Sequence, residues 1–126
     1  VDTGAYMGIQ QAGVAALASW EAFVPANVAV FQARRDAAVA AFRQAGFTCA
    51  VPQAAMYLWI PLPEGVASQA FADRLLEDEG VVVMPGSGFG AAGEGFFRIS
   101  FIAPPERLAE AAVRAGRCLA GFGVAA

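Results

Sequence analysis

The sequence contains no histidine and no lysine, and all eight of its basic residues are arginine. Without histidine the chain cannot form a Ser-His-Asp triad or a Cys-His nucleophile pair. Without lysine it cannot form a Schiff base with a carbonyl group, and it has no lysine-dependent phosphate loop. These absences exclude a large part of nucleophilic and carbonyl chemistry for this chain acting alone.

Cysteine is scarce as well, with only Cys49 and Cys118 in the chain. A structural zinc ion needs four nitrogen or sulfur ligands, and these two cysteines lie far apart with no CxxC spacing. No metal site is therefore expected. Free cysteine is usually buried, so both residues are predicted to be reduced thiols in the core.

Charge is also sparse. Charged residues make up 15% of the chain, the net charge is −3, and the arginines are scattered rather than clustered. Nothing resembles the basic stripe that neutralises a phosphate backbone, so neither nucleic acid nor an anionic membrane surface is expected as a partner. The two longest uncharged stretches, 3–20 and 44–63, are interrupted by glutamine and glycine or by proline. They predict no membrane span, and no secretory signal pattern is visible.

Hydrophobic residues are in excess. They make up 58% of the chain before its 14 glycines are counted, whereas average domains have roughly 45–50% with glycine included. The first residue is Val1 rather than methionine. Together these features predict a piece of a longer protein whose other part covers apolar surface. We expect the isolated chain to self-associate through the apolar faces of its first two helices.

Apolar periodicity predicts one α/β domain of the α+β type, with the order ααββαββα and a small mixed or antiparallel sheet covered by helices. The elements expected are a helix from residue 2 or 3 to 25, a helix over 27–46, strands over 47–51 and 55–60, a helix over 68–80, strands over 81–84 and 96–102, and a helix from 104 or 105 onward.

Local signals set the predicted boundaries. The two strands over 47–51 and 55–60 are separated by a connection of hairpin length. The apolar run 81–84 is typical of a strand buried on both faces. Serine, threonine, aspartate and asparagine favour helix N-caps, while glycine and proline end helices. The caps expected are Asp2 or Thr3, Asn27 and Ser68, and the helix ends expected are Pro25, Gly46 and Gly80.

Residues 88–93 spell GxGxxG directly after a predicted strand, as a dinucleotide-binding loop does. That loop needs a helix opening at its end, so that the amide groups meet the pyrophosphate. Here Gly95 leads into another predicted strand instead. The motif is therefore interpreted as a flexible connection between two strands.

Arg98 is the most informative residue, because it stands alone among apolar residues in the strand predicted over 96–102. A partly buried guanidinium needs an anionic partner. One reading pairs it with an internal acid such as Glu94 or Glu79. The other leaves it for a ligand, because the planar guanidinium binds a carboxylate in bidentate fashion and the glycine-rich loop upstream would admit a small carboxylic acid.

The chain resembles the fold type I pyridoxal phosphate-dependent aminotransferases of class I/II, of the aspartate and LL-diaminopimelate aminotransferase type. The resemblance covers nearly the whole chain. The segments that carry it are DTG at 2–4 with IQ at 9–10, RRD at 34–36, AMYLW at 55–59, GVVVMPG at 80–86 with FG at 89–90, and above all GEGFFRIS at 93–100.

The resemblance implies that Arg98 binds the α-carboxylate of the substrate and that Phe89 and Gly90 line the substrate pocket. It implies that residues 25–126 form the C-terminal small domain, which closes over the substrate, and that the helix over 1–24 belongs to a large domain. The pyridoxal phosphate would be held on a lysine of that large domain. No catalytic residue is expected in this chain, which alone would be inactive.

The function expected of the intact protein is transfer of an amino group between an amino acid and a 2-oxo acid, in the cytoplasm and as a homodimer. The LL-diaminopimelate, aspartate and alanine types all remain open. Residues 34–36 are expected to form a structural ion-pair cluster, and Tyr57 and Trp59 to lie in the core or an interface. The alternative is a non-catalytic module of the same fold that binds a carboxylate or another subunit. Absence of a lysine in a cofactor-binding segment of the longer protein would favour that alternative.

Overall fold

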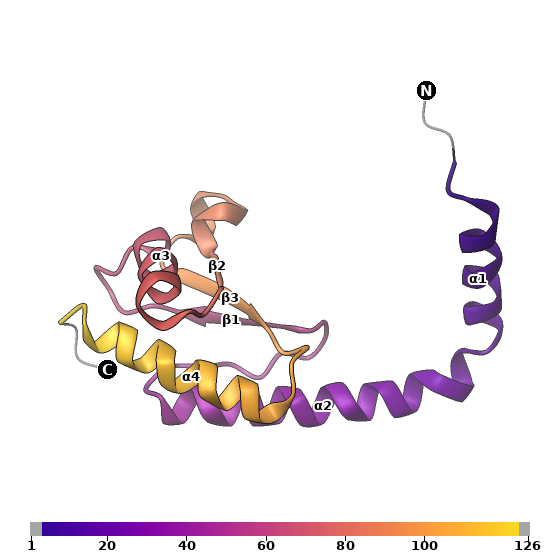
Figure 1. The fold of residues 1–126 in the computed structure, drawn as a ribbon, viewed down its shortest axis with the longest axis horizontal. Helices are drawn as coiled ribbons and strands as arrows, with labels where there is room; N and C mark the ends of the chain where they lie inside the picture. Colours follow the sequence, from indigo (N-terminus) through magenta and orange to yellow (C-terminus); the bar gives the residue numbers. More distant parts are fainter. Residues whose placement is uncertain (1–3, 124–126) are drawn as a thin grey trace. The chain divides into compact units, whose positions relative to one another are not determined.

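The structure is a computed structural model that describes residues 4–123, and the chain divides into two units, Val1–Val30 and Phe31–Ala126. Two helices come first, α1 (Met7–Ala18) and α2 (Trp20–Gln44), as Figure 1 shows. The helix α2 begins in the first unit and ends in the second. The sheet and the other helices all belong to the second unit.

The break between the first two helices lies at Ser19, where φ is −117° and the hydroxyl donates to the carbonyl of Ala15 at 2.8 Å. The prediction that Pro25 ends the first helix is wrong, as is the N-cap at Asn27, because both residues lie inside α2. Pro25 is the sixth residue of α2, so its missing N–H costs the helix one hydrogen bond without ending it. The caps predicted at residues 2 and 3 lie outside the described residues.

Three strands form one antiparallel sheet in the order β1-β3-β2. They are β1 (Tyr57–Pro61), β2 (Met84–Pro85) and β3 (Phe96–Ser100). In this register both Trp59 of β1 and Met84 of β2 lie opposite Arg98 of β3. The α+β class and the antiparallel sheet are confirmed.

The predicted hairpin between 47–51 and 55–60 is wrong, because the segment 47–51 is not a strand. Phe47 and Cys49 are buried, as alternation predicts. The backbone there is held in another way, since Arg43 donates two hydrogen bonds, of 2.9 and 2.7 Å, to the carbonyl of Cys49. A side chain thus provides the donors that a neighbouring strand would have provided.

The predicted strand over 81–84 is also largely wrong. Gly80 ends α3 (Ser68–Glu79) in the left-handed conformation, with φ of 65°. The N–H of Val81 then donates to the carbonyl of Leu75 at 3.2 Å, and Val82 is 71% exposed. The first residues of the run 81–84 therefore belong to the C-terminal cap of α3. Only the last residue of the run, Met84, is part of the sheet.

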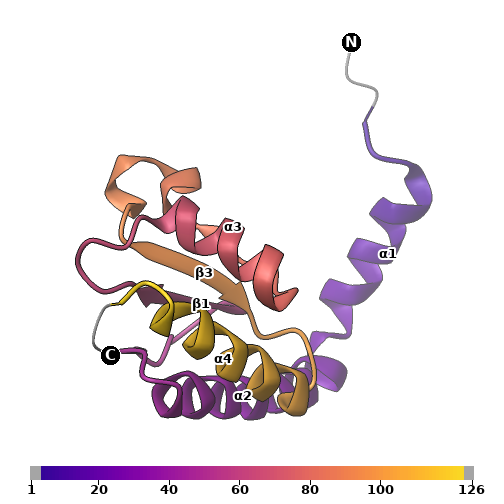
Figure 2. The same cartoon turned by 60° about the vertical axis from the view of Figure 1, so that its left-hand side comes forward.

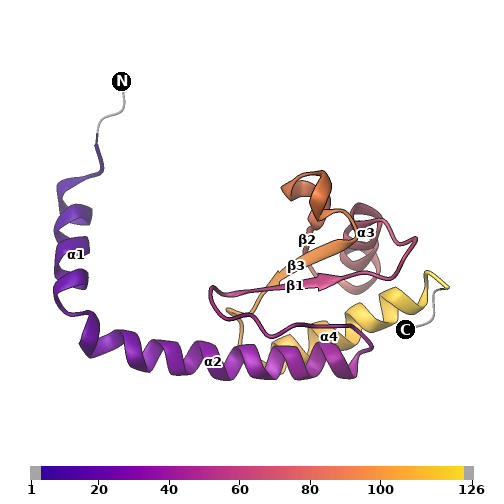
Figure 3. The ribbon, with the colours of Figure 1, turned by 180° about the vertical axis from the view of Figure 1, so that it is seen from behind.

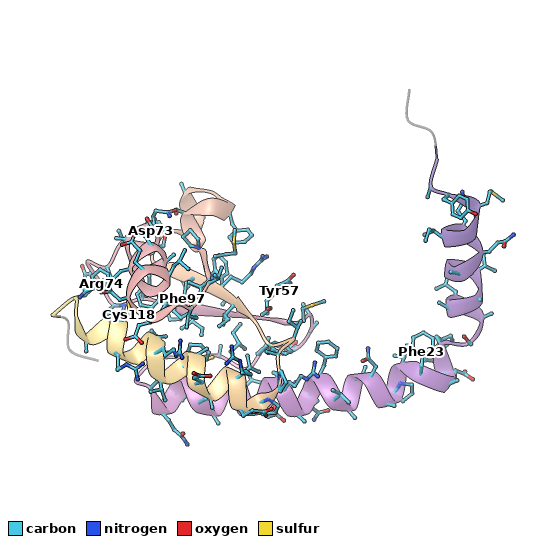
Figure 4. The ribbon with its side chains drawn as sticks, viewed as in Figure 1. Phe23, Tyr57, Asp73, Arg74, Phe97 and Cys118 are labelled. Atoms are coloured by element: carbon cyan, nitrogen blue, oxygen red, sulfur yellow. The ribbon has the colours of Figure 1, made fainter. Side chains whose placement is uncertain are left out.

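The core lies on one side of the sheet. In Figures 2 and 3 the later part of α2 and the helix α4 (Pro105–Ala120) run side by side along that side of β1 and β3. Phe97 of β3, labelled in Figure 4, is fully buried. Its ring centroid lies 5.0 to 6.1 Å from those of Phe42, Phe47 and Phe71. Successive strand residues face opposite ways, so Arg98 emerges on the other face of the sheet.

The predicted ion-pair cluster at 34–36 is confirmed in part. Arg35 and Asp36 pair at 2.7 Å. Arg34 donates instead to the carbonyl of Ile102 at 2.7 Å and lies over the ring of Phe31. These contacts join α2 to the segment that follows β3, so the arginines of this motif are structural.

Candidate carboxylate-binding site

The candidate site is the face of the sheet opposite the core, with Arg98 at its centre. Arg98 is half-buried in the middle of β3. Its neighbours across the strands on this face are Trp59 and Met84. Tyr57 lies two residues before Trp59 on β1, so its side chain points to the same face. The side chains of β1 that point this way are only partly covered, with Tyr57 37% and Trp59 39% exposed.

Two aromatic rings flank the guanidinium of Arg98. Its central carbon lies 4.1 Å from the ring centroid of Tyr57 and 4.4 Å from that of Phe89. Both distances are well within the range of a cation–π contact. The guanidinium of Arg98 makes no hydrogen bond or ion pair within residues 4–123, so its N–H groups have no acceptor among the described residues. The contacts thus restrain the arginine while leaving its hydrogen-bond donors available.

Arg98 differs from the other arginines in having no hydrogen bond or ion pair within residues 4–123. The other seven each donate to a carboxylate or to a backbone carbonyl in that range. The bonds in question are those of Arg34, Arg35, Arg43, Arg74, Arg107, Arg114 and Arg117.

The internal acids that the sequence offered to Arg98 are engaged elsewhere. Glu79 pairs with Arg117 at 2.6 Å, and this hydrogen bond is the main cause that lowers the pKa of the Glu79 carboxyl. Glu94 accepts hydrogen bonds from Ser68 instead. The pairing of Arg98 with Glu94 or Glu79 is therefore not what the structure shows, and the ligand-binding alternative remains.

A surface cavity of about 200 Å³ opens beside the guanidinium. Its lining combines the side of β3 with the chain that precedes β2, and includes Tyr57, Val82, Met84, Arg98 and Ser100. One positive charge in an otherwise mostly uncharged lining suits a small molecule with one carboxylate. The volume is enough for a compact acid rather than for a large ligand.

Two further residues belong to the candidate site although the sequence predicts them only for the core or an interface. Tyr57 contacts Arg98, and Trp59 packs edge-on against Phe89, with ring centroids 5.5 Å apart. The alternation of β1 places both residues on one face. Only the register with β3, which joins residues about forty positions apart in the chain, shows that this face is the one that carries Arg98.

The loop between β2 and β3 supplies Phe89. It consists of two single 3₁₀ turns, η1 (Gly86–Phe89) and η2 (Ala91–Gly93), and then enters β3. The prediction that the GxGxxG motif connects two strands is thus confirmed, but the predicted flexibility is not, because the backbones of Gly86 and Gly93 pack directly against each other. Gly90, predicted to line the pocket with Phe89, is exposed between the turns with φ of 109°, a conformation that favours glycine. Neither residue is part of the cavity lining, so Phe89 meets Arg98 beside the cavity rather than within it.

This chain does not provide the groups that would hold pyridoxal phosphate. The sequence has no lysine to form the Schiff base, and within residues 4–123 no three metal-ligating side chains gather together. The residues present fit a carboxylate and not the cofactor.

No single described helix is long and apolar enough to cross a membrane, although α1 and α2 taken together reach that length and composition.

Comparisons with known proteins point to one enzyme family. A family model for aminotransferase class I and II matches residues 6–115. An LL-diaminopimelate aminotransferase of Oleidesulfovibrio alaskensis is 46% identical over 114 residues, which are 90% of this chain and 29% of that protein. One from Moorella thermoacetica is 40% identical over 119 residues, which are 94% of this chain and 30% of that protein.

Solved structures show the same fold. A probable N-succinyldiaminopimelate aminotransferase from Thermus thermophilus superimposes with a TM-score of 0.84 and 39% identity, over 94% of this chain and 32% of that one. An aspartate aminotransferase from Thermotoga maritima gives a TM-score of 0.68 and 32% identity, over 76% of this chain and 24% of that one.

The chain belongs to the class I and II aminotransferase family. The family assignment made from the sequence is thus confirmed. The chain spans less than a third of the length of the curated relatives described above.

Proposed function

We propose that this chain is the C-terminal small domain of a pyridoxal phosphate-dependent aminotransferase, and that Arg98 binds the α-carboxylate of its amino acid and 2-oxo acid substrates. One observation carries the proposal. Of the eight arginines, Arg98 alone has no hydrogen-bond or ion-pair partner within residues 4–123, and its guanidinium contacts the rings of Tyr57 and Phe89. A charge kept half-buried, restrained and unpaired is suited to an anionic ligand.

The chain's own residues bind and orient the substrate. Two parallel N–H groups of the Arg98 guanidinium donate to the two oxygens of a carboxylate, which fixes the carboxylate in the guanidinium plane. The bond from that carboxylate to the α-carbon is then fixed in direction as well. Tyr57 and Phe89 contact Arg98 with the faces of their rings, and no hydrogen bond joins either of them to its N–H groups, so they support the orientation without competing for the ligand.

The remaining chemistry belongs to other parts of the longer protein. The cofactor acts as an electron sink when bound and requires a lysine as its attachment and proton-transfer base. This chain has no lysine, so it has no transaminase activity by itself. We propose that residues 25–126 close over the substrate, that the helix over 1–24 belongs to the large domain, and that the intact enzyme is a cytoplasmic homodimer.

The substrate side chain stays open. Two of the relatives described above are named LL-diaminopimelate aminotransferases, while a protein of the same fold is named an aspartate aminotransferase. The Arg98 site recognises the carboxylate that all amino acids and 2-oxo acids share. Discrimination among them must therefore come from residues other than Arg98.

The test is the Arg98→Met substitution in the full-length protein, with Arg107→Met as the matched control. Arg107 pairs with Glu110 on the exposed face of α4. Loss of a charge-assisted hydrogen bond costs about 1.5 to 3 kcal/mol, so the KM for the 2-oxo acid is expected to rise roughly 10- to 150-fold in Arg98→Met.

The cofactor absorption should be the same in both variants, because Arg98 does not hold the cofactor. An unchanged KM in Arg98→Met would refute the proposed role of Arg98. A full-length protein that binds carboxylates but shows no borohydride-sensitive cofactor absorption would support the non-catalytic module instead.

A further inference from the structure

Glu94 connects the loop that carries Phe89 to the start of α3. Its carboxylate accepts a hydrogen bond from the backbone N–H of Ser68 at 2.7 Å and another from the Ser68 hydroxyl at 2.9 Å. The same hydroxyl accepts from the backbone N–H of Ser87 at 3.2 Å and lies 3.1 Å from the Ser87 hydroxyl. Ser68 is fully buried. A continuous set of hydrogen bonds therefore runs from Glu94 through Ser68 to the first turn of the loop.

This arrangement corrects the expected role of Ser68. The predicted N-cap is the first residue of α3, and the cap position is Ala67, which makes no side-chain cap hydrogen bond. Glu94, distant in the sequence, provides the cap with its carboxylate. A negative charge is favourable at a helix N-terminus, and the hydrogen bonds from Ser68 are the main cause that lowers the pKa of Glu94. The carboxylate thus stays ionised at neutral pH.

The two ends of the loop are also packed directly against each other. A Cβ atom built on Gly86 would lie 1.9 Å from the carbonyl oxygen of Gly93, and one built on Gly93 would lie 2.1 Å from that of Gly86. The backbones at Gly86 and Gly93 lie so close together that a side chain on either residue would not fit. Between this crossing point and the Ser87 contact, the loop has little freedom, and Phe89 projects from it onto Arg98 at 4.4 Å.

We propose that Glu94 is a positioning residue for the carboxylate-binding site: by joining Ser68 and Ser87, it holds Phe89 against the guanidinium of Arg98. The inference rests on the proposed function of Arg98. Glu94 does not touch the substrate in this account. It acts through the loop, and its effect on substrate binding depends on the presence of the Phe89 ring.

Glu94→Gln is the informative substitution, because it keeps the shape of the side chain and removes its charge. A glutamine has one acceptor oxygen, whereas the carboxylate accepts from two donors of Ser68. The amide NH₂ would then face either the Ser68 N–H or a hydroxyl that already accepts from Ser87. In either arrangement the charge-assisted hydrogen bonds are replaced by weaker neutral ones, and the loop gains freedom. Glu77→Gln is the matched control, since Glu77 is an exposed carboxylate on α3, the helix that Glu94 caps.

The kinetic experiment uses the full-length holoenzyme with 2-oxoglutarate as the probe. In Glu94→Gln we expect the KM to rise about 3- to 10-fold while kcat changes less than about twofold, as for lost binding rather than lost chemistry. Glu77→Gln should match the wild type. In a Phe89→Leu background, Glu94→Gln should raise the KM less than about 1.5-fold further, because the effects of two substitutions that act through the same contact do not add. Additive effects would overturn the route through Phe89.

Amide hydrogen exchange of residues 86–93 gives a readout independent of activity. Faster exchange in Glu94→Gln, but not in Glu77→Gln, supports the connection, and unchanged exchange overturns it. If Glu94→Gln does not fold, Ser68→Ala removes the shared hydroxyl and undergoes the same two measurements. Failure of the proposed function shows separately, as an unchanged KM in Arg98→Met, whereas failure of this inference leaves the Arg98→Met effect intact.

Discussion

Replacing Tyr57 by leucine tests how the site prepares Arg98 for a ligand. The Tyr57 ring lies 4.1 Å from the guanidinium carbon on one side, while Phe89 lies 4.4 Å from it. In Tyr57→Leu one of the two rings is gone and the arginine side chain regains rotamer freedom. That freedom must be lost again when a carboxylate binds, at a cost of about 0.5 to 1.5 kcal/mol for one rotamer-rich side chain.

This cost predicts that the dissociation constant of a 2-oxo acid rises roughly 2- to 12-fold in Tyr57→Leu. The loss of a cation–π contact at a half-exposed site, about 0.5 to 1 kcal/mol, is of similar size. The measurement is a titration of the full-length protein with 2-oxoglutarate. Tyr57→Phe is the matched control, because it keeps the ring and removes only the hydroxyl.

The two substitutions must behave differently for the reasoning to stand. Tyr57→Phe should bind within about twofold of the wild type, because a phenyl ring also makes a cation–π contact. Equal losses in Tyr57→Phe and Tyr57→Leu would assign the effect to the hydroxyl and refute stacking as its cause. No loss in either would show that Arg98 is held by other contacts.

Three further predictions concern the stability and chemistry of the second unit. Phe97 is fully buried among phenylalanines, so Phe97→Ala should lower the free energy of unfolding in urea by about 3 to 5 kcal/mol, and Phe97→Leu by clearly less. The Arg117 hydrogen bond lowers the pKa of the Glu79 carboxyl. The stabilisation that this ion pair gives the folded state is therefore present above the unfolded pKa of Glu79 and is lost as pH falls through the lower folded pKa. Glu79→Gln should flatten the acid side of a curve of unfolding free energy against pH, and an unchanged curve would contradict the pairing. Burial raises the pKa of the Cys49 and Cys118 thiols, so at pH 8 iodoacetamide should modify them only after unfolding, and rapid labelling of the folded chain would contradict their burial.

The family of this protein could be predicted from its sequence because the motif residues lie in continuous segments. The segment at 93–100 places a single arginine in an apolar strand, and that pattern alone indicated a buried charge in need of an anion. The helix ends at Gly46 and Gly80 were also predictable, because each of these glycines adopts a positive φ. Signals of this kind depend only on neighbouring residues.

Two of the wrong predictions failed because a side chain outside the segment makes the hydrogen bonds that the local pattern assigned to the segment itself. The segment 47–51 alternates as a strand does, but Arg43 satisfies part of its backbone. Ser68 has the residue type of an N-cap, but Glu94 takes that role from a different part of the chain. In each case a side chain from elsewhere offered a better hydrogen bond than the local one.

The sequence by itself determined the family, the α+β class and the choice of Arg98 as the residue proposed to bind a carboxylate. Each of these follows from residue types at short spacing. The tertiary structure decided what surrounds that arginine, namely the rings of Tyr57 and Phe89 and the engagement of Glu94 and Glu79 by other partners. Strand register and loop packing set those distances, and both depend on long-range burial that no local pattern encodes.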